Sequence, residues 1–227
     1  MTGAGALIVF VKAPRPGATK TRLAQRLGEQ AAVEVYRAMA EEALRRTAPR
    51  AGDYERLVFW APADAGPEVE AWLAAETCLP QVEGDLGRRM AAAFDEVFRR
   101  GARQAALVGS DVPRISRAVV IEALAGLEEH DVVLGPAHDG GYYLVALAGS
   151  CPALFTGMPW STPSVLAATL ERARTLGLSV RLLEPLRDVD TLEDLRAEWP
   201  LVAPLIDETP RARIEAALSG ATDIPSR

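Results

Sequence analysis

The chain has 227 residues, and its 25 basic and 31 acidic side chains give a formal net charge of −6. This balance argues against a general surface for nucleic acid or anionic membranes, and the length suits one α/β domain better than two. Two distant cysteines without metal-site spacing argue against a disulfide scaffold or a zinc site, and no apolar stretch has signal-peptide or membrane length. We therefore expect a cytoplasmic protein of unspecified oligomeric state, with one domain over residues 1–220 and a flexible tail over residues 221–227.

Short apolar runs alternate with helical periodicity through the first half of the chain. Runs of four to eight apolar residues indicate buried strands, and apolar residues spaced three or four apart indicate one face of a helix. In chain order, the expected elements are a strand over residues 6–11, a helix over 32–44, a strand over 56–62, a helix over 67–76, a strand over 79–85 and a helix over 86–98.

The second half continues this alternation but contains one different segment. In DVVLGPAHDGGYYLVALAG, residues 131–149, the Asp-Gly-Gly between two apolar runs predicts a tight turn joining antiparallel strands. The other expected elements are a strand over residues 105–111, a helix of about 12 residues from Ser116, a Pro-rich loop over 157–163, a helix over 163–176, a strand over 179–186 and a C-terminal helical segment.

This order of elements predicts an α/β fold with a mostly parallel central sheet, helices on both faces and an antiparallel insertion. Right-handed crossover connections place helices on both faces of such a sheet. Ligands of these sheets bind at the carboxyl ends of the strands.

Polar residues follow several of the expected strands, so we expect them to converge on one sheet edge. Each has a structural alternative: Asp85 could cap a helix, Asp111 could stabilise a turn before Pro113, and Asp190 could begin the last helix. The residues that follow strands are Gly84, Asp85, Ser110, Asp111, His138, Asp139, Asp188 and Asp190.

The segment VKAPRPGATKTRL, residues 11–23, follows the first strand and is rich in cations. Gly17 lets the backbone approach a ligand, and the following helix start presents free N–H groups to an anion. Cations at a helix start oppose its dipole, which favours phosphate binding by Lys20 and Arg22 over a solvated surface role. Lys12 and Arg15 are further candidates, and the glycines of a P-loop are missing.

Carboxylates gathered at one edge repel one another unless a cation lies among them. Mg²⁺ uses one or two carboxylates together with substrate phosphates, so the sequence predicts a site for Mg²⁺ or Mn²⁺.

The motifs VKAPRPGATKTRL, EGDLGRRM, VGSDVP, GPAHDGGYYLVAL, PWST and DVDTLEDL occur in this order over residues 7–195. Together they resemble a bacterial family of GT-A-type transferases of the nucleotide-diphospho-sugar transferase superfamily, whose members include radical-SAM or selenodomain-associated and arsenosugar-type proteins. The resemblance implies a Rossmann-like GT-A fold with the opening loop beside nucleotide phosphates. It implies that Asp111 binds the metal and that Asp188 or Asp190 completes the metal site.

We predict site residues of three kinds. Lys20, Asp111 and Asp139 are the expected catalytic residues, with Asp139 as the base; His138 is an alternative base, and a turn-forming role is an alternative for Asp139. The expected nucleotide-binding residues are Lys12, Arg15, Gly17, Lys20, Arg22, Asp85, Gly87 and Ser110. The expected acceptor pocket consists of His138, Gly140, Gly141, Trp160 and Ser161.

The predicted reaction is metal-dependent transfer from a nucleotide-activated donor to a small acceptor, most simply glycosyl transfer from a nucleotide sugar. No Ser, Cys or Lys stands in a recognisable nucleophile motif, so catalysis would be electrostatic. One alternative is a nucleotidyltransferase that joins an NTP to a phosphorylated small molecule and releases pyrophosphate. Another is a nucleotide-binding module without turnover.

Overall fold

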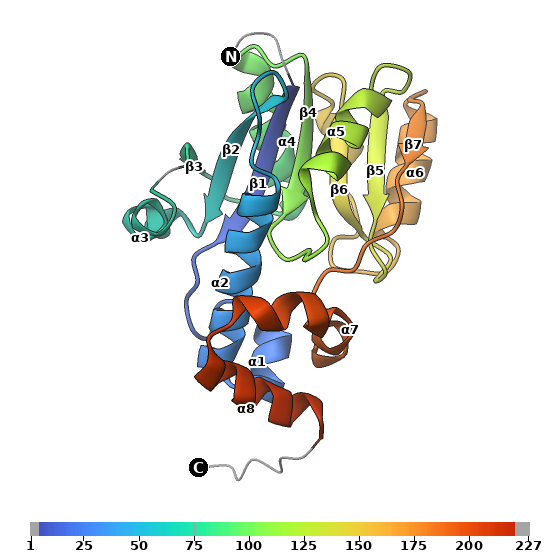
Figure 1. Cartoon of the computed structure of the whole chain (residues 1–227). Coiled ribbons are helices and arrows are strands. Elements are labelled where there is room, and N and C mark those ends of the chain that lie inside the picture. The colour runs from blue at the N-terminus through green and yellow to red at the C-terminus, as the bar shows by residue number, and fades with distance from the viewer. Residues whose placement is uncertain (1–4, 75, 221–227) are drawn as a thin grey trace.

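The computed structural model describes residues 5–74 and 76–220, and the predicted tail over residues 221–227 lies outside them. Within this part of the chain, seven strands form one sheet (Figure 1). Among the described helices, none is both long and apolar enough to cross a membrane.

The sheet is mostly parallel, as predicted. Every neighbouring pair of strands is parallel except the two pairs that contain β6, which runs antiparallel to β4 and β5. β5 and β6 are joined by the predicted Asp-Gly-Gly turn, so the antiparallel insertion is confirmed. In spatial order the strands are β3 (Cys78–Pro80), β2 (Tyr54–Ala61), β1 (Gly5–Lys12), β4 (Gln104–Gly109), β6 (Tyr142–Leu147), β5 (Val132–Pro136) and β7 (Val180–Leu182).

Helices cover both faces of this sheet. α2, α3 and α5 pack on one face, and α4 and α6 pack on the other. The helices of the described residues are α1 (Thr21–Leu27), α2 (Glu29–Arg46), α3 (Gly66–Trp72), α4 (Leu86–Arg99), α5 (Arg117–Gly126), α6 (Val165–Thr175), α7 (Leu192–Val202) and α8 (Glu208–Leu218). Short 3₁₀ helices, η1 (Ala63–Ala65), η2 (Pro152–Phe155) and η3 (Ala203–Leu205), lie between them.

Two hydrophobic cores lie on opposite faces of β1. Successive side chains of a strand point to opposite faces, so Leu7 and Val9 pack with α2, α3 and α5, whereas Ala6 and Ile8 pack with α4 and α6. Burial on both faces explains why this strand is a continuous apolar run instead of an alternating one. The prediction of helices on both faces is confirmed.

The helices after the opening loop differ from the prediction in one respect. The chain forms the short α1 first and then turns at Gly28, whose φ of 84° lies in the left-handed region, before α2 begins. Leu23 of α1 and Val35 of α2 pack against Leu195 and Ile214 in a third core. The C-terminal helices α7 and α8 therefore lie against α1 and α2, beyond the end of the sheet (Figure 1).

β7 is shorter than the predicted strand over residues 179–186. Pro185 has no backbone N–H to donate, and the strand ends at Leu182. The chain nevertheless stays beside β5, because Leu183 N donates to Leu134 O at 2.9 Å and Leu186 N donates to Pro136 O at 3.1 Å. This irregular segment leads residues 187–190 to the carboxyl edge of the sheet.

Candidate functional site

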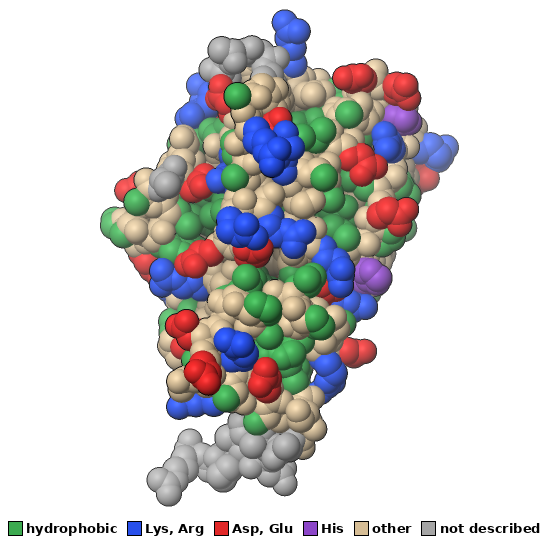
Figure 2. Space-filling model, viewed as in Figure 1, with side chains coloured by type: hydrophobic (Ala, Val, Ile, Leu, Met, Phe, Trp, Pro, Cys, Tyr) green, Lys and Arg blue, Asp and Glu red, His purple; other side chains and the backbone are tan. Residues whose placement is uncertain are grey.

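A cavity of about 440 Å³ opens at the carboxyl ends of β1 and β4. Its walls come from these strands, the opening loop, α1, α2, α4, β6 and the segment before α7. Charged residues that line it are Lys12, Lys20, Arg22, Arg89, Asp111 and Asp190. The cavity lies at the sheet edge where the carboxyl-edge rule predicts ligand binding. On the face of the molecule seen in Figure 2, acidic and basic side chains are interspersed.

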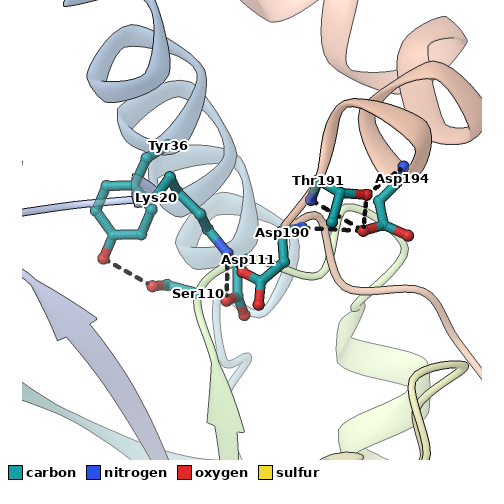
Figure 3. A network of polar contacts seen from close by, with 7 residues as sticks. All are labelled: Lys20, Tyr36, Ser110, Asp111, Asp190, Thr191 and Asp194. Carbon is teal, nitrogen blue, oxygen red and sulfur yellow. Dashed lines mark hydrogen bonds and ion pairs between the residues drawn. The ribbon is translucent and has the colours of Figure 1, made fainter. Parts of the chain in front are cut away.

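Lys20 lies at the centre of this site, held between two carboxylates. Its Nζ donates to Oδ2 of Asp111 at 2.7 Å and to Oδ1 of Asp190 at 2.5 Å (Figure 3). The Lys20 side chain is only 6% exposed. Its backbone adopts φ 50° and ψ 50°, the left-handed conformation that non-glycine residues rarely adopt.

Mutual charge stabilisation keeps Lys20 and Asp111 ionised. Burial alone would lower the pKa of Lys20, but the charges and hydrogen bonds of Asp111 and Asp190 outweigh it and raise this pKa. Burial would likewise raise the pKa of Asp111, and the ammonium of Lys20 outweighs this effect, so the pKa is lowered. The site thus contains fixed charges of both signs.

Two hydrogen bonds hold the loop that carries Asp111. Val189 N donates to Asp111 O at 3.0 Å, and Arg46 donates to Pro113 O at 3.3 Å. The carboxylate of Asp111 folds back over Gly109, where an added Cβ would lie 2.7 Å from Oδ1. The glycine at the end of β4 therefore leaves room for the carboxylate.

Asp190 immediately precedes the N-cap of α7. Thr191 accepts a hydrogen bond from Asp194 N, and the Asp194 carboxylate accepts one from Thr191 N, which forms a capping box. The helix start predicted here therefore exists, with Thr191 as its cap. Asp190 remains available to pair with Lys20.

Asp188 is not among the lining residues of the cavity, and it is the least compensated of the three predicted metal-binding carboxylates. It forms no ion pair with any residue that the structure describes. Burial first, and then the charges of Asp111, Asp139 and Asp190, raise its pKa to about 7. This surplus of negative charge would be relieved by a cation.

The donor set suits a hard divalent metal. Asp111, Asp188 and Asp190 offer carboxylate oxygens, the ligands that Mg²⁺ and Mn²⁺ prefer. In the arrangement seen here, no three acidic, His or Cys side chains of the described residues lie close enough to hold an ion together. The Lys20 ammonium stands between two of the three carboxylates instead.

A buried hydroxyl pair supports the opening loop. Lys12 N donates to the hydroxyl oxygen of Tyr36 at 2.7 Å, and this hydroxyl lies 3.0 Å from Oγ of Ser110. Burial raises the pKa of Tyr36 to about 12, so the phenol stays neutral. Ser110, predicted to bind nucleotide, lines the cavity and links β4 to α2. The sequence predicts Tyr36 only as part of the helix over residues 32–44 and gives no sign of this role.

Three cations in the cavity wall lack carboxylate partners among the described residues. Lys12 and Arg22 are exposed and form no ion pair. Arg89, on α4, is half-buried and donates only to Oε1 of Gln81, at 3.1 Å. Burial lowers the pKa of Arg89. Neither Arg89 nor Gln81 was predicted as a site residue from the sequence, although Arg89 belongs to the motif EGDLGRRM.

Two residues predicted in the opening loop lie outside the cavity. Arg15 turns outward and pairs with Asp64 and Glu68, at 3.1 Å and 2.8 Å. Gly17 has φ 75° and faces Glu29, whose Oε1 would be 3.3 Å from an added Cβ. The loop thus divides its cations between the cavity and a surface ion-pair network.

Asp85 and Gly87 also lie outside the cavity lining. The Asp85 carboxylate accepts a hydrogen bond from Arg88 N at 2.8 Å and caps α4, which is the structural alternative considered above. A Cβ at Gly87 would lie 2.5 Å from the carbonyl oxygen of Phe155. The glycine therefore permits close packing of α4 against η2.

The turn between β5 and β6 has a clear structural role. Asp139 Oδ1 accepts a hydrogen bond from Gly141 N at 2.8 Å. Asp139 therefore has the turn-forming role that was the alternative to a role as base. Gly140 has φ 91°, and a Cβ there would lie 2.1 Å from Pro163 O. His138 and Asp139 are both exposed. Asp139 still lies near enough to raise the pKa of Asp188.

Of the predicted acceptor residues, only Ser161 lines the cavity. It has a φ of 63°, another left-handed non-glycine residue. Trp160 packs edge-on against Tyr142, with ring centroids 6.5 Å apart, and belongs to the core beneath the loop. The structure brings Lys20, Asp111 and Asp190 together and leaves the other acceptor candidates outside.

Comparisons with known proteins agree with this fold. The model of the family described as "Uncharacterized protein conserved in bacteria (DUF2064)" matches residues 44–162. A crystal structure from Desulfovibrio desulfuricans G20, named "putative nucleotide-diphospho-sugar transferase", is 31% identical, with a TM-score of 0.84 over 96% of this chain and 97% of that chain. No curated protein matches the chain.

More distant structures share the fold alone. CMP:2-keto-3-deoxy-manno-octonic acid synthetase complexed with CTP is 17% identical, with a TM-score of 0.54 over 88% of this chain and 99% of that chain. Rv0371C from Mycobacterium tuberculosis H37Rv, in complex with manganese, is also 17% identical, with a TM-score of 0.51 over 86% of this chain and 97% of that chain.

Proposed function

The chain belongs to the bacterial DUF2064 family within the nucleotide-diphospho-sugar transferase superfamily, and on this premise we propose that it transfers a sugar from a nucleotide-diphospho-sugar to a small acceptor with a divalent metal. The relative of 31% identity carries the name of such a transferase. The association with radical-SAM proteins or arsenosugar biosynthesis stays a prediction.

One observation carries this proposal: unpaired cations share a cavity with paired acidic groups. Lys12, Arg22 and Arg89 have no carboxylate partner among the described residues, whereas Asp111 and Asp190 hold Lys20. Cations left without counter-ions favour an anionic ligand such as a diphosphate. The volume of about 440 Å³ is within the usual range for small-molecule sites.

Each group then has a chemical role. Lys12 and Arg22 would bind phosphate oxygens, and with Lys20 they would stabilise the charge that develops on the departing diphosphate. Asp111 and Asp190, with Asp188, would hold Mg²⁺ or Mn²⁺, which when bound neutralises phosphate charge. Asp139 remains the proposed base for the acceptor hydroxyl, with His138 as the alternative; both are exposed at the same edge.

Nucleotidyl transfer is the second candidate, and the number of unpaired cations is compatible with it. Three such side chains, Lys12, Arg22 and Arg89, match the charge of a triphosphate as well as that of a diphosphate. A nucleotide-binding module without turnover is disfavoured, because the uncompensated Asp188 is costly unless a cation uses it.

Ligand-dependent thermal unfolding tests the proposal. The protein is heated with nucleotide sugars or NTPs, each with and without Mg²⁺ or Mn²⁺; a ligand at about 100 times its Kd stabilises by about 2.7 kcal/mol. We expect stabilisation by nucleotide sugars, followed by release of nucleoside diphosphate in turnover assays. Stabilisation by NTPs with pyrophosphate release would instead establish nucleotidyl transfer.

A matched pair of aspartate variants tests the metal dependence. Asp111→Asn should abolish metal-dependent turnover while the fold is retained. Asp207→Asn makes the same change at an exposed residue outside the cavity and should leave turnover unchanged. Full activity in Asp111→Asn would overturn the metal assignment, and no response to any nucleotide would overturn the proposed function.

A further inference from the structure

Lys20 occupies the position that a metal held by Asp111 and Asp190 would need. Its Nζ lies within 2.7 Å of one carboxylate and 2.5 Å of the other (Figure 3). Its side chain is 6% exposed, whereas those of Asp111 and Asp190 are 31% and 43% exposed. The chain thus pairs these two carboxylates with a single cation of its own.

An ammonium and a divalent ion cannot share these two oxygens. Mg²⁺ binds carboxylate oxygens at about 2.0–2.1 Å, closer than the ammonium approaches. At such separations the two cations would repel each other strongly. Metal binding to Asp111 and Asp190 through these two oxygens therefore requires Lys20 to leave.

The cavity offers Lys20 another place to go. Its side chain lines the same space as Lys12 and Arg22, where the proposed function places phosphates. The flexible four-carbon stem of a lysine allows its ammonium to follow a new anion. The negative charge of the phosphates would thus neutralise the Lys20 ammonium after the metal has displaced it from the two aspartates.

We propose that Lys20 is the resident cation of this site and exchanges for the divalent metal when a phosphate-bearing ligand enters the cavity. This inference rests on the proposed function and adds to it a means of regulating metal binding. Metal alone must compete with Lys20, and the ligand alone must draw Lys20 away from two aspartates. Metal and ligand therefore bind interdependently, each raising the affinity for the other.

Mn²⁺ binding to the nucleotide-free protein tests the exchange without any measurement of activity. Free and bound Mn²⁺ are distinguished by electron paramagnetic resonance. We expect Lys20→Gln to bind Mn²⁺ at least about tenfold more tightly than the unmodified protein, because the competing charge is gone. Lys20→Gly makes the same test with a residue that suits the left-handed backbone, should the first variant fold poorly.

Three further variants isolate the cause. Lys20→Arg keeps the positive charge and should bind Mn²⁺ as weakly as the unmodified protein. Arg26→Gln removes a cation from an exposed position of α1, the helix that Lys20 precedes, outside the cavity. It should have no effect on Mn²⁺ affinity. Adding Asp190→Asn to Lys20→Gln should remove the gain in Mn²⁺ affinity. This loss would show that the ion binds at this site.

Unchanged Mn²⁺ affinity in both Lys20→Gln and Lys20→Gly would overturn the exchange and leave Lys20 as a structural ion pair. An equal gain in Arg26→Gln would also overturn it, since general charge would then explain the effect. The proposed function fails by a different result, the lack of any nucleotide response in the unmodified protein. The two failures are therefore distinguishable.

Discussion

A Cβ added to Gly109 would lie 2.7 Å from Oδ1 of Asp111, closer than side chains pack. Only the far end of the Asp111 side chain is in the way, so Gly109→Ala should move the carboxylate and leave the fold intact. We expect turnover to fall about 10- to 100-fold, since small misplacements of catalytic groups have effects of this size. Kinetics and circular dichroism of the variant test this.

Gly149→Ala is the matched control, because nothing lies within 4 Å of its added Cβ. It should leave both turnover and unfolding temperature unchanged. If Gly109→Ala retained full activity, the position of the Asp111 carboxylate would not matter for the reaction.

The capping box of α7 should affect both stability and activity. Thr191→Ala removes a hydrogen bond to Asp194 N and should reduce the free energy of unfolding by about 1 kcal/mol. Because Asp190 precedes this cap, we also expect a lower turnover number. Ser116→Ala removes the cap of α5, away from the cavity, and should reduce stability by a similar amount with normal turnover. Equal kinetics in the two variants would show that the cap serves folding alone.

The positions of Lys20, Asp111 and Asp190 could be predicted because each follows the carboxyl end of a strand or of the segment that extends one. The carboxyl ends of parallel strands lie at the same edge of the sheet, so residues at these positions come together whatever their side chains are. The role of Tyr36 could not be predicted, because helical periodicity identifies the buried face but not which strand end a hydroxyl reaches. Asp85 and Asp139 proved to be a cap and a turn residue, the structural alternatives that their sequence neighbours also allowed.

The hydroxyl of Tyr36 should position Lys12 for its ligand. Tyr36→Phe leaves the buried N–H of Lys12 without its acceptor, which costs about 1–3 kcal/mol of stability. We expect nucleotide affinity to fall several-fold as well. In Tyr54→Phe, a buried hydroxyl bonded to Thr47 O is lost far from the cavity. Calorimetric titration with nucleotide should find weaker binding only in Tyr36→Phe; equal affinities in the two variants would assign Tyr36 to stability alone.

Asp188 should make the stability of the metal-free protein depend on pH. Its pKa is raised to about 7, whereas an unfolded Asp titrates at about 3.9. The folded chain therefore binds the extra proton between these values, and this contribution to stability falls as the pH rises from about 4 to about 7. With chelator present, the Tm should fall more between pH 5 and pH 7 in the unmodified protein than in Asp188→Asn. An equal fall of the Tm in the unmodified protein and in Asp188→Asn would contradict this prediction.

Arg15 and Arg22 stand in the same basic segment, and only the structure separates their roles. Asp64 and Glu68, about 50 residues further along the chain, neutralise Arg15 outside the cavity, whereas Arg22 lines the cavity without a carboxylate partner among the described residues. No feature of the segment itself reveals those distant acidic partners, so charge alone made both arginines candidates.

Glutamine variants of the two arginines test this difference with an identical change of charge. Arg22→Gln should weaken nucleotide binding about 10- to 150-fold, because a hydrogen bond to a charged group contributes about 1.5–3 kcal/mol. Arg15→Gln should leave binding unchanged, since its surface ion pairs contribute little and lie outside the cavity. Nucleotide titrations at two salt concentrations measure both effects, and the difference should shrink at high salt. Equal losses in the two variants would mean that the segment attracts phosphates through its overall charge, with no specific contact by Arg22.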